Sequence, residues 1–155
     1  MHLLPRFLLI RYRLSAVIAT LVVAVDLGSK QLIQQYLDGA VNGGGFLSLV
    51  PATNSGFSFS AMSGHTAVTV LLATTALLFC ARLLTRVQSK VATVALAFII
   101  GGGLSNLLDR AFHAGQVSDF IGVSTWFVCN GADIAISLGV VLLLVPFCTG
   151  RKVLH

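Results

Sequence analysis

The sequence predicts an all-α integral membrane protein with four transmembrane helices and a small β element on the outer side. Hydrophobic residues make up 56% of its 155 residues and charged residues only 10%, whereas soluble domains carry roughly 25% charged residues. The mean hydropathy is +0.93. This length allows a single membrane domain over residues 1–155 and leaves no room for a separate soluble domain.

Four apolar segments are each close to the roughly 20 residues that span a bilayer core; they cover about 14–37, 67–84, 91–108 and 132–147. Lipid offers no hydrogen-bond partners to the backbone, so these segments should be helices. The first is interrupted by the polar segment 26–30. A cleaved signal peptide is the competing interpretation of residues 14–25, because basic residues precede them. No clear small-residue cleavage site follows, and the charge distribution favours a retained span.

The basic residues predict how the helices are oriented. Eight of the ten precede the first apolar segment, lie between the second and third, or follow the fourth. By the positive-inside rule both termini are cytoplasmic, and the loops at about 38–66 and 110–131 face outward. Only Lys30 and Arg110 fall on the other side. The basic residues form no stripe with interleaved aromatics, which argues against nucleic-acid binding.

The first outer loop predicts two short strands, at residues 46–50 and 57–59, joined by a turn over 51–56. The strands are rich in Phe, Leu and Val, and the turn contains Pro, Asn and Gly. This element would lie on the outer membrane surface. The glycines at 43–45 are interpreted as a hinge or a turn.

All five acidic residues are aspartates, and four of them are expected at the outer end of the helices. At 1.5 Å of rise per residue, Asp109 and Asp133 lie about 27–28 Å from the basic residues at the inner end of their helices. Asp26 is deeper, and Asp119 lies in the second outer loop. An ionised carboxylate is costly near lipid and usually marks a site. The fifth, Asp38, is interpreted as a solvated loop acid.

Asp119 and Asp133 are the candidate catalytic pair. Two carboxylates in contact share a proton, so one can act as general base on a water molecule and the other as general acid. This chemistry requires no metal and no cofactor, and the scattered Cys and His residues predict no metal site. The alternatives are a helix N-terminal acid for Asp133, favoured by the helix dipole, and a solvated loop acid for Asp119.

The remaining polar residues each allow a structural and a site interpretation. Asn106 and Arg110 share a helix face, and Asp109 with Arg110 forms either a surface ion pair or part of a site. Asn130 either caps a helix or orients the carboxylate pair. Asp26 and Lys30 are expected to pair within the apolar zone. Asn54 either caps a turn or offers its amide to an extended peptide, and Gly101–Gly103 favours close helix packing.

Five motifs in order resemble one family, lipoprotein signal peptidase, also called signal peptidase II. They are D-x-x-x-K at 26–30, N-x-G-x-x-F/S at 54–59, G-G-x-x-x-N-x-x-D-R within 101–110, V-x-D-F at 117–120 and F-N-x-A-D, of which N-x-A-D is present, at 130–133. No single motif is specific, but their order, the four spans and the orientation agree with that family over nearly the whole chain.

The resemblance implies a membrane aspartic endopeptidase that removes the signal peptide from prolipoproteins, cleaving before a diacylglyceryl-modified Cys. It places Asp119 and Asp133 on the catalytic dyad. It also assigns supporting or substrate-contacting positions to Asn54, Asn106, Arg110 and Asn130, and a structural motif to Asp26 and Lys30. The implied fold is four transmembrane helices with a β-cradle in the bacterial inner membrane, with the active site at the outer face. We expect a monomer in the lipid bilayer that needs no cofactor.

Departures from the family pattern concern substrate fit. Cys129 stands where Phe is usual, and Ser118 where an apolar residue is usual. The segment between Arg110 and Asp119 is short, and Phe57 and Phe59 are bulky. A non-catalytic homologue that binds lipidated peptides is one alternative. A small transporter would place acids at mid-membrane in repeated halves, and a presenilin-like protease would need a G-x-G-D motif; the sequence has neither.

Overall fold

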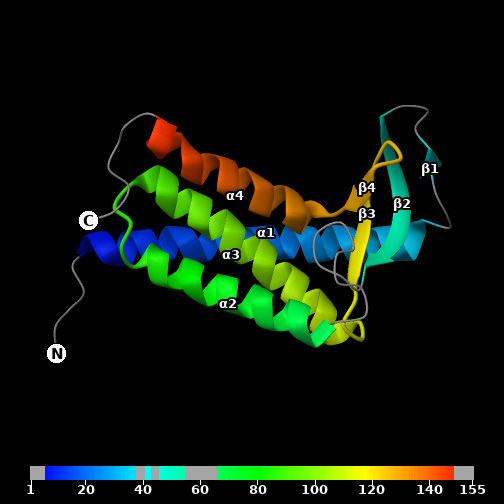
Figure 1. Ribbon diagram of the computed structural model, residues 1–155, viewed down its shortest axis with the longest axis horizontal. Coiled ribbons are helices and arrows are strands. Elements are labelled where there is room, and N and C mark those ends of the chain that lie inside the picture. Colours follow the sequence, from blue (N-terminus) through cyan, green and yellow to red (C-terminus); the bar gives the residue numbers. More distant parts are fainter. Residues whose placement is uncertain (1–5, 38–40, 43–45, 55–65, 149–155) are drawn as a thin grey trace.

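The computed structural model describes residues 6–37, 41–42, 46–54 and 66–148, and it consists of four helices with a small sheet across one end (Figure 1). The helices are α1 (Arg6–Tyr36), α2 (Thr66–Leu84), α3 (Lys90–Phe112) and α4 (Gly131–Cys148). Helix α1 passes without a break through the polar segment 26–30. Helices over Leu8–Tyr36, Thr66–Leu84 and Lys90–Phe112 are long and apolar enough to cross a membrane, and Gly131–Leu144 is a shorter apolar helix. The four predicted helices are therefore confirmed.

Helix α3 is the central element, and its three consecutive glycines explain why. A methyl group on Gly101 would lie 2.9 Å from the Ala19 backbone of α1, and one on Gly102 would lie 2.5 Å from the Ala132 carbonyl oxygen of α4. At Gly103 the same group would lie 2.7 Å from the side chain of Leu77 on α2. Each glycine thus faces a different helix at close approach, so the close packing expected from these residues is confirmed.

The sheet is antiparallel, with strands in the order β1 (Val41–Asn42), β2 (Leu47–Asn54), β3 (Val117–Val123) and β4 (Phe127–Cys129). Ala52 of β2 lies opposite Asp119 of β3, and Ile121 of β3 lies opposite Cys129 of β4. The second outer loop, expected at 110–131, therefore contains strands β3 and β4, and β3 pairs with β2 of the first outer loop. Helix α3 also extends four residues beyond the expected end at 108.

The turn predicted at 51–56 is wrong for residues 51–54, because β2 continues through Pro51 to Asn54. Its pairing with β3 shifts between Leu49 and Ala52. A bulge of this kind accommodates a proline, which has no N–H to donate to the neighbouring strand. The expected strand at 57–59, the glycines at 43–45 and Asp38 lie outside the described residues.

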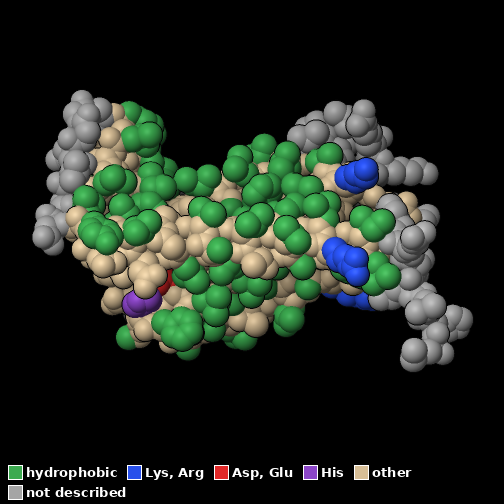
Figure 2. All heavy atoms as spheres, turned by 180° about the vertical axis from the view of Figure 1, so that it is seen from behind, with side chains coloured by type: hydrophobic (Ala, Val, Ile, Leu, Met, Phe, Trp, Pro, Cys, Tyr) green, Lys and Arg blue, Asp and Glu red, His purple; other side chains and the backbone are tan. Residues whose placement is uncertain are grey.

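Polar and apolar side chains are segregated along the molecule (Figure 2). Exposed basic side chains gather at the end away from the sheet, and those of the described residues include Arg13, Arg82, Arg86 and Lys90. Large hydrophobic side chains are exposed along the middle of the helices, among them Leu21, Leu71, Leu78 and Val141. Extensive exposed apolar surface of this kind marks a membrane or protein contact.

Candidate active site

Asp119 and Asp133 reach the sheet end of the helices from different elements. Asp119 lies on β3 and is 5% exposed, so its interpretation as a solvated loop acid is wrong. Asp133 is in the first turn of α4 and is partly buried. Strand β4 and Asn130 connect the two elements, which places both carboxylates beside the same residue.

Asn130 is fully buried and contacts both carboxylates. Its side-chain Nδ2 donates to Asp119 Oδ1 over 2.6 Å, and its backbone N–H donates to Asp133 Oδ2 over 3.3 Å. The backbone N–H of Asp133 donates in return to Asn130 Oδ1 over 2.9 Å. This reciprocal pair is a capping box at the start of α4. Both interpretations of Asn130, as a helix cap and as a donor to Asp119, are therefore confirmed.

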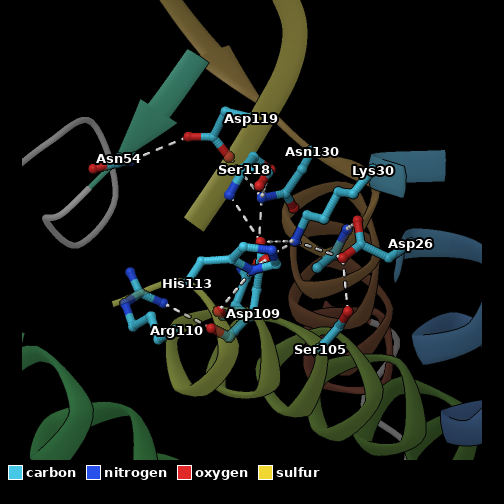
Figure 3. A network of polar contacts seen from close by, with 12 residues as sticks. Asp26, Lys30, Asn54, Ser105, Asp109, Arg110, His113, Ser118, Asp119 and Asn130 are labelled. Atoms are coloured by element: carbon cyan, nitrogen blue, oxygen red, sulfur yellow. Dashed lines mark hydrogen bonds and ion pairs between the residues drawn. The ribbon is translucent and has the colours of Figure 1, made fainter. Parts of the chain in front are cut away.

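Each carboxylate also accepts a hydrogen bond from a second amide. Asn54 Nδ2 at the end of β2 donates to Asp119 Oδ2 over 3.2 Å, and Figure 3 shows it approaching on the side away from Asn130. Asn106 Nδ2 on α3 donates to Asp133 Oδ1 over 2.9 Å. Asn130 Nδ2 also donates to Asn106 Oδ1 over 3.2 Å. We call Asp119, Asn130 and Asp133, with Asn54 and Asn106, the amide cluster.

Burial and the nearby charge of Asp133 raise the pKa of Asp119 to about 6. Hydrogen bonds from Asn54 and Asn130, and the positive charge of Lys30, act in the opposite direction. Within the described part of the chain, neither Asp119 nor Asp133 forms an ion pair. Because burial and a nearby carboxylate charge both make ionisation of Asp119 costly, Asp119 keeps its proton to a higher pH than an exposed carboxyl group does.

A second cluster lies directly beside the first and is built around Lys30. The Lys30 ammonium is 2.7 Å from Asp26 Oδ2 and 3.1 Å from Asp109 Oδ2, and all three side chains are at most 3% exposed. It also donates to Asn106 Oδ1 over 3.0 Å, which joins the two clusters. We call Asp26, Lys30 and Asp109 the lysine cluster; the expected pairing of Asp26 with Lys30 is confirmed.

The lysine cluster ties together elements that are distant in sequence. Asp26 on α1 accepts from Ser105 Oγ over 2.7 Å and from the Ala132 backbone N–H over 2.8 Å, so it supplies a hydrogen bond at the N-terminus of α4. Asp109 on α3 accepts from the Ser118 backbone N–H over 2.7 Å. It therefore holds the residue that precedes Asp119 on β3 (Figure 3).

Of the two interpretations of Asp109 with Arg110, the surface ion pair is wrong, because Asp109 is 1% exposed and contacts Lys30 and His113. Arg110 is also buried, and its Nη1 donates to the Asn106 backbone carbonyl over 3.2 Å, consistent with the shared helix face. The charge of Arg110 acts electrostatically on Asp119 and Asp133. Asn54 ends β2 and donates to Asp119; residues 55–56 of the turn that it would cap lie outside the described residues, so that interpretation stays a prediction.

Sequence reasoning did not assign a site position to Ser105, His113 or Ser118. His113 follows Asp109 by four residues, and this helical spacing could have indicated their 2.7 Å ion pair. No comparable signal marks Ser105 or Ser118.

Burial and nearby carboxylates raise the pKa of the Cys129 thiol on β4 to about 11, which keeps it protonated at neutral pH. Among the described residues, no three Cys, His, Asp or Glu side chains are grouped as a metal site.

Comparisons with known proteins agree with this architecture. The family described as signal peptidase (SPase) II matches residues 18–149. A lipoprotein signal peptidase of Mycobacterium leprae is 33% identical over 147 residues, covering 87% of this chain and 71% of that protein. A lipoprotein signal peptidase of Methylocella silvestris is 44% identical over 107 residues, which cover 64% of this chain and 62% of that protein. A bacterial membrane enzyme structure determined in meso at 2.3 Å superposes with a TM-score of 0.78 at 23% identity, covering 87% of each chain.

Proposed function

Because this chain belongs to the signal peptidase II family, we propose that it is a membrane aspartic endopeptidase that removes the signal peptide from prolipoproteins. The scissile bond precedes a diacylglyceryl-modified Cys. The observation that carries this assignment is Asn130, which donates to both Asp119 and Asp133 from a fully buried position. Among the described residues neither carboxylate forms an ion pair, and two carboxylates that both contact the neutral Asn130 are suited to sharing a proton.

The reaction proceeds by water activation. The ionised carboxylate of the pair takes a proton from a water molecule, and the oxygen of that water molecule attacks the peptide carbonyl carbon. The protonated carboxylate then donates its proton to the departing amide nitrogen as the C–N bond breaks. The products are a carboxylic acid and an amine, and the pair again holds one proton. Asn54 and Asn130 orient Asp119, and Asn106 orients Asp133.

Asp26 and Lys30 support the site by holding the backbone at the start of α4 and the side chain of Asn106. Arg110 lies one helical turn beyond Asn106, where its charge acts on both catalytic carboxylates. Substrate contacts of Asn54 and Arg110 are part of this proposal, and no metal or cofactor is required for the reaction.

The proposed membrane arrangement follows from the segregation of charge. The N-terminal end of α1 and the C-terminal end of α4 lie together at the end opposite the sheet (Figure 1). Exposed Arg13, Arg82, Arg86 and Lys90 gather at that end, which supports a cytoplasmic location for it. All four helices then span the bacterial inner membrane as one domain over residues 1–155. The sheet and the site lie at the outer face, and the protein acts as a monomer.

The decisive experiment is cleavage of a diacylglyceryl-modified peptide by the purified protein. We expect Asp119→Asn and Asp133→Asn each to lower kcat by about 10²–10⁴-fold, the usual contribution of a general acid or base. The matched control Asp38→Asn removes an acid to which the sequence assigns no role and should keep near-full activity. Near-full activity of either dyad variant would show that the dyad assignment is wrong. A folded wild-type protein that binds the peptide without cutting it would instead support the non-catalytic alternative.

A further inference from the structure

A pocket of about 190 Å³ lies between the last turns of α1 and strands β2 and β3. It is lined by Lys30, Ile33 and Gln34 from α1, by 51–53 of β2 and by 118–120 of β3. Pockets for drug-sized ligands measure about 300–1,000 Å³, while a cavity of about 150 Å³ accepts a benzene ring. The volume therefore suits one amino-acid side chain, and Asp119 forms part of the wall.

One wall of the pocket is polar and is formed by Gln34 and Ser118. Gln34 Nε2 donates to Ser118 Oγ over 2.6 Å. The Gln34 side chain is exposed, whereas Ser118 is only 6% exposed. The Ser118 backbone is fixed separately, because its N–H donates to Asp109 and its carbonyl accepts from Asn130. Among the described residues, the Gln34 side-chain carbonyl oxygen accepts no hydrogen bond, so it can accept one from a hydroxyl group in the pocket.

The charges around the pocket select against an ionised ligand. An acidic side chain would meet the carboxylate of Asp119, and the Lys30 ammonium is already engaged by Asp26, Asp109 and Asn106. A cationic side chain would pair with Asp119 and hold it ionised, which would interfere with proton sharing. An uncharged side chain with an apolar body and a hydroxyl group fits both the apolar and the polar walls.

We propose that this pocket binds one uncharged side chain of the substrate peptide beside the scissile bond, and that Gln34 and Ser118 make it prefer a hydroxyl-bearing residue. The inference rests on the proposed function, because it deepens the specificity of that site. Gln34 and Ser118 are specificity-determining residues in this arrangement, and they take no part in proton transfer. Threonine and valine have nearly the same shape, so they separate hydrogen bonding from size.

The test uses pairs of diacylglyceryl-modified peptides that differ only in Thr or Val at one of the three positions before the modified Cys. At one position we expect wild-type kcat/KM to favour Thr about fivefold, the effect of one neutral hydrogen bond. Gln34→Leu and Ser118→Ala should bring that ratio close to one. The matched control Gln35→Leu, on the same helix but outside the pocket wall, should leave the ratio unchanged.

Each outcome decides the inference. Equal Thr-to-Val ratios in wild type and both pocket variants at all three positions would overturn it while leaving the proposed function intact. Failure of the wild type to cleave any of the lipidated peptides would overturn the proposed function itself. If Ser118→Ala does not fold, Gln34→Leu decides alone, because the Gln34 side chain is exposed on α1 and its loss leaves the backbone hydrogen bonds of Ser118 in place.

Discussion

The lysine cluster and the amide cluster are neighbours built from the same acidic residue, but they differ in what lies between the carboxylates. In the lysine cluster the Lys30 ammonium contacts Asp26 and Asp109 directly. In the amide cluster the neutral side chain and backbone of Asn130 contact Asp119 and Asp133. Asn106 accepts hydrogen bonds from both centres, so the two clusters share a boundary.

This difference shows how the group between two aspartates decides whether they stabilise the fold or are suited to proton transfer. An ammonium at contact distance offsets the negative charge of both of its carboxylates, so ion pairs hold these buried groups together. An amide can donate hydrogen bonds but cannot neutralise charge, so ionising both of its carboxylates is costly. Under the proposed function the amide cluster holds the transferable proton, whereas the lysine cluster ties α1, α3 and α4 together.

The largest effect on stability should come from removing the central cation. We expect Lys30→Met to lower the free energy of unfolding by about 3–5 kcal/mol, because it leaves Asp26 and Asp109 buried without their partner. The matched control Lys90→Met removes an exposed lysine at the far end and should change stability by no more than about 0.5 kcal/mol. Thermal unfolding in detergent measures both. Equal shifts in the two variants would show that the lysine cluster is not a scaffold.

A smaller stability effect, with a large effect on activity, is expected at Asn130. Asn130→Ala removes the helix cap and should cost about 1 kcal/mol of stability. Asn130→Ser keeps a good cap but has no amide to reach Asp119, so it should retain most of the stability. Both variants should lose more than about tenfold in kcat/KM, since one hydrogen bond to a charged group contributes about 1.5–3 kcal/mol. Full activity in the Ser variant would remove Asn130 from the catalytic arrangement.

The pH dependence of activity tests the electrostatics of the amide cluster. With the pKa of Asp119 near 6, we expect one limb of the bell-shaped pH profile of kcat/KM close to pH 6. Asn54→Ala should move this limb to higher pH, because the hydrogen bond from Asn54 lowers that pKa. Measurement between about pH 4 and 8 covers the limb. A shift to lower pH would contradict the assigned hydrogen bond.

The same pKa has a consequence for stability. It lies above the value of about 3.9 in an unfolded chain, so the folded state binds the proton more tightly. The contribution of Asp119 to stability should therefore fall as pH rises from about 4 to 6 and stay constant above that range. Asp119→Asn should flatten this part of the stability curve, whereas Asp38→Asn should not. An unchanged slope in Asp119→Asn would place the titration elsewhere.

The smallest effect is expected at the edge of the lysine cluster. His113 contacts Asp109 over 2.7 Å, but its side chain is 50% exposed. Exposed ion pairs contribute at most about 1 kcal/mol, so His113→Gln should lower stability by less than that amount. A loss as large as that of Lys30→Met would show that His113 belongs to the buried core of the cluster.

The sequence by itself determined the helices, the shared end of four aspartates and the family. Apolar runs and the positions of basic residues are local properties, and a bilayer converts them directly into spans and orientation. The glycines at 101–103 likewise predicted close packing, because small residues allow it wherever they occur in a helix. The family could be identified because five motifs in order are specific when none is alone.

Only the tertiary structure decided which groups the polar residues contact across different helices and strands. Asp109 pairs with Lys30 from α1, not with its chain neighbour, and Asp26 reaches the Ala132 backbone 106 residues away. Strand β2 continues through Pro51 because pairing with β3 tolerates a bulge there. These partners are set by how helices and strands pack, which no local pattern encodes. For the same reason, packing alone placed a cation between one pair of aspartates and an amide between the other.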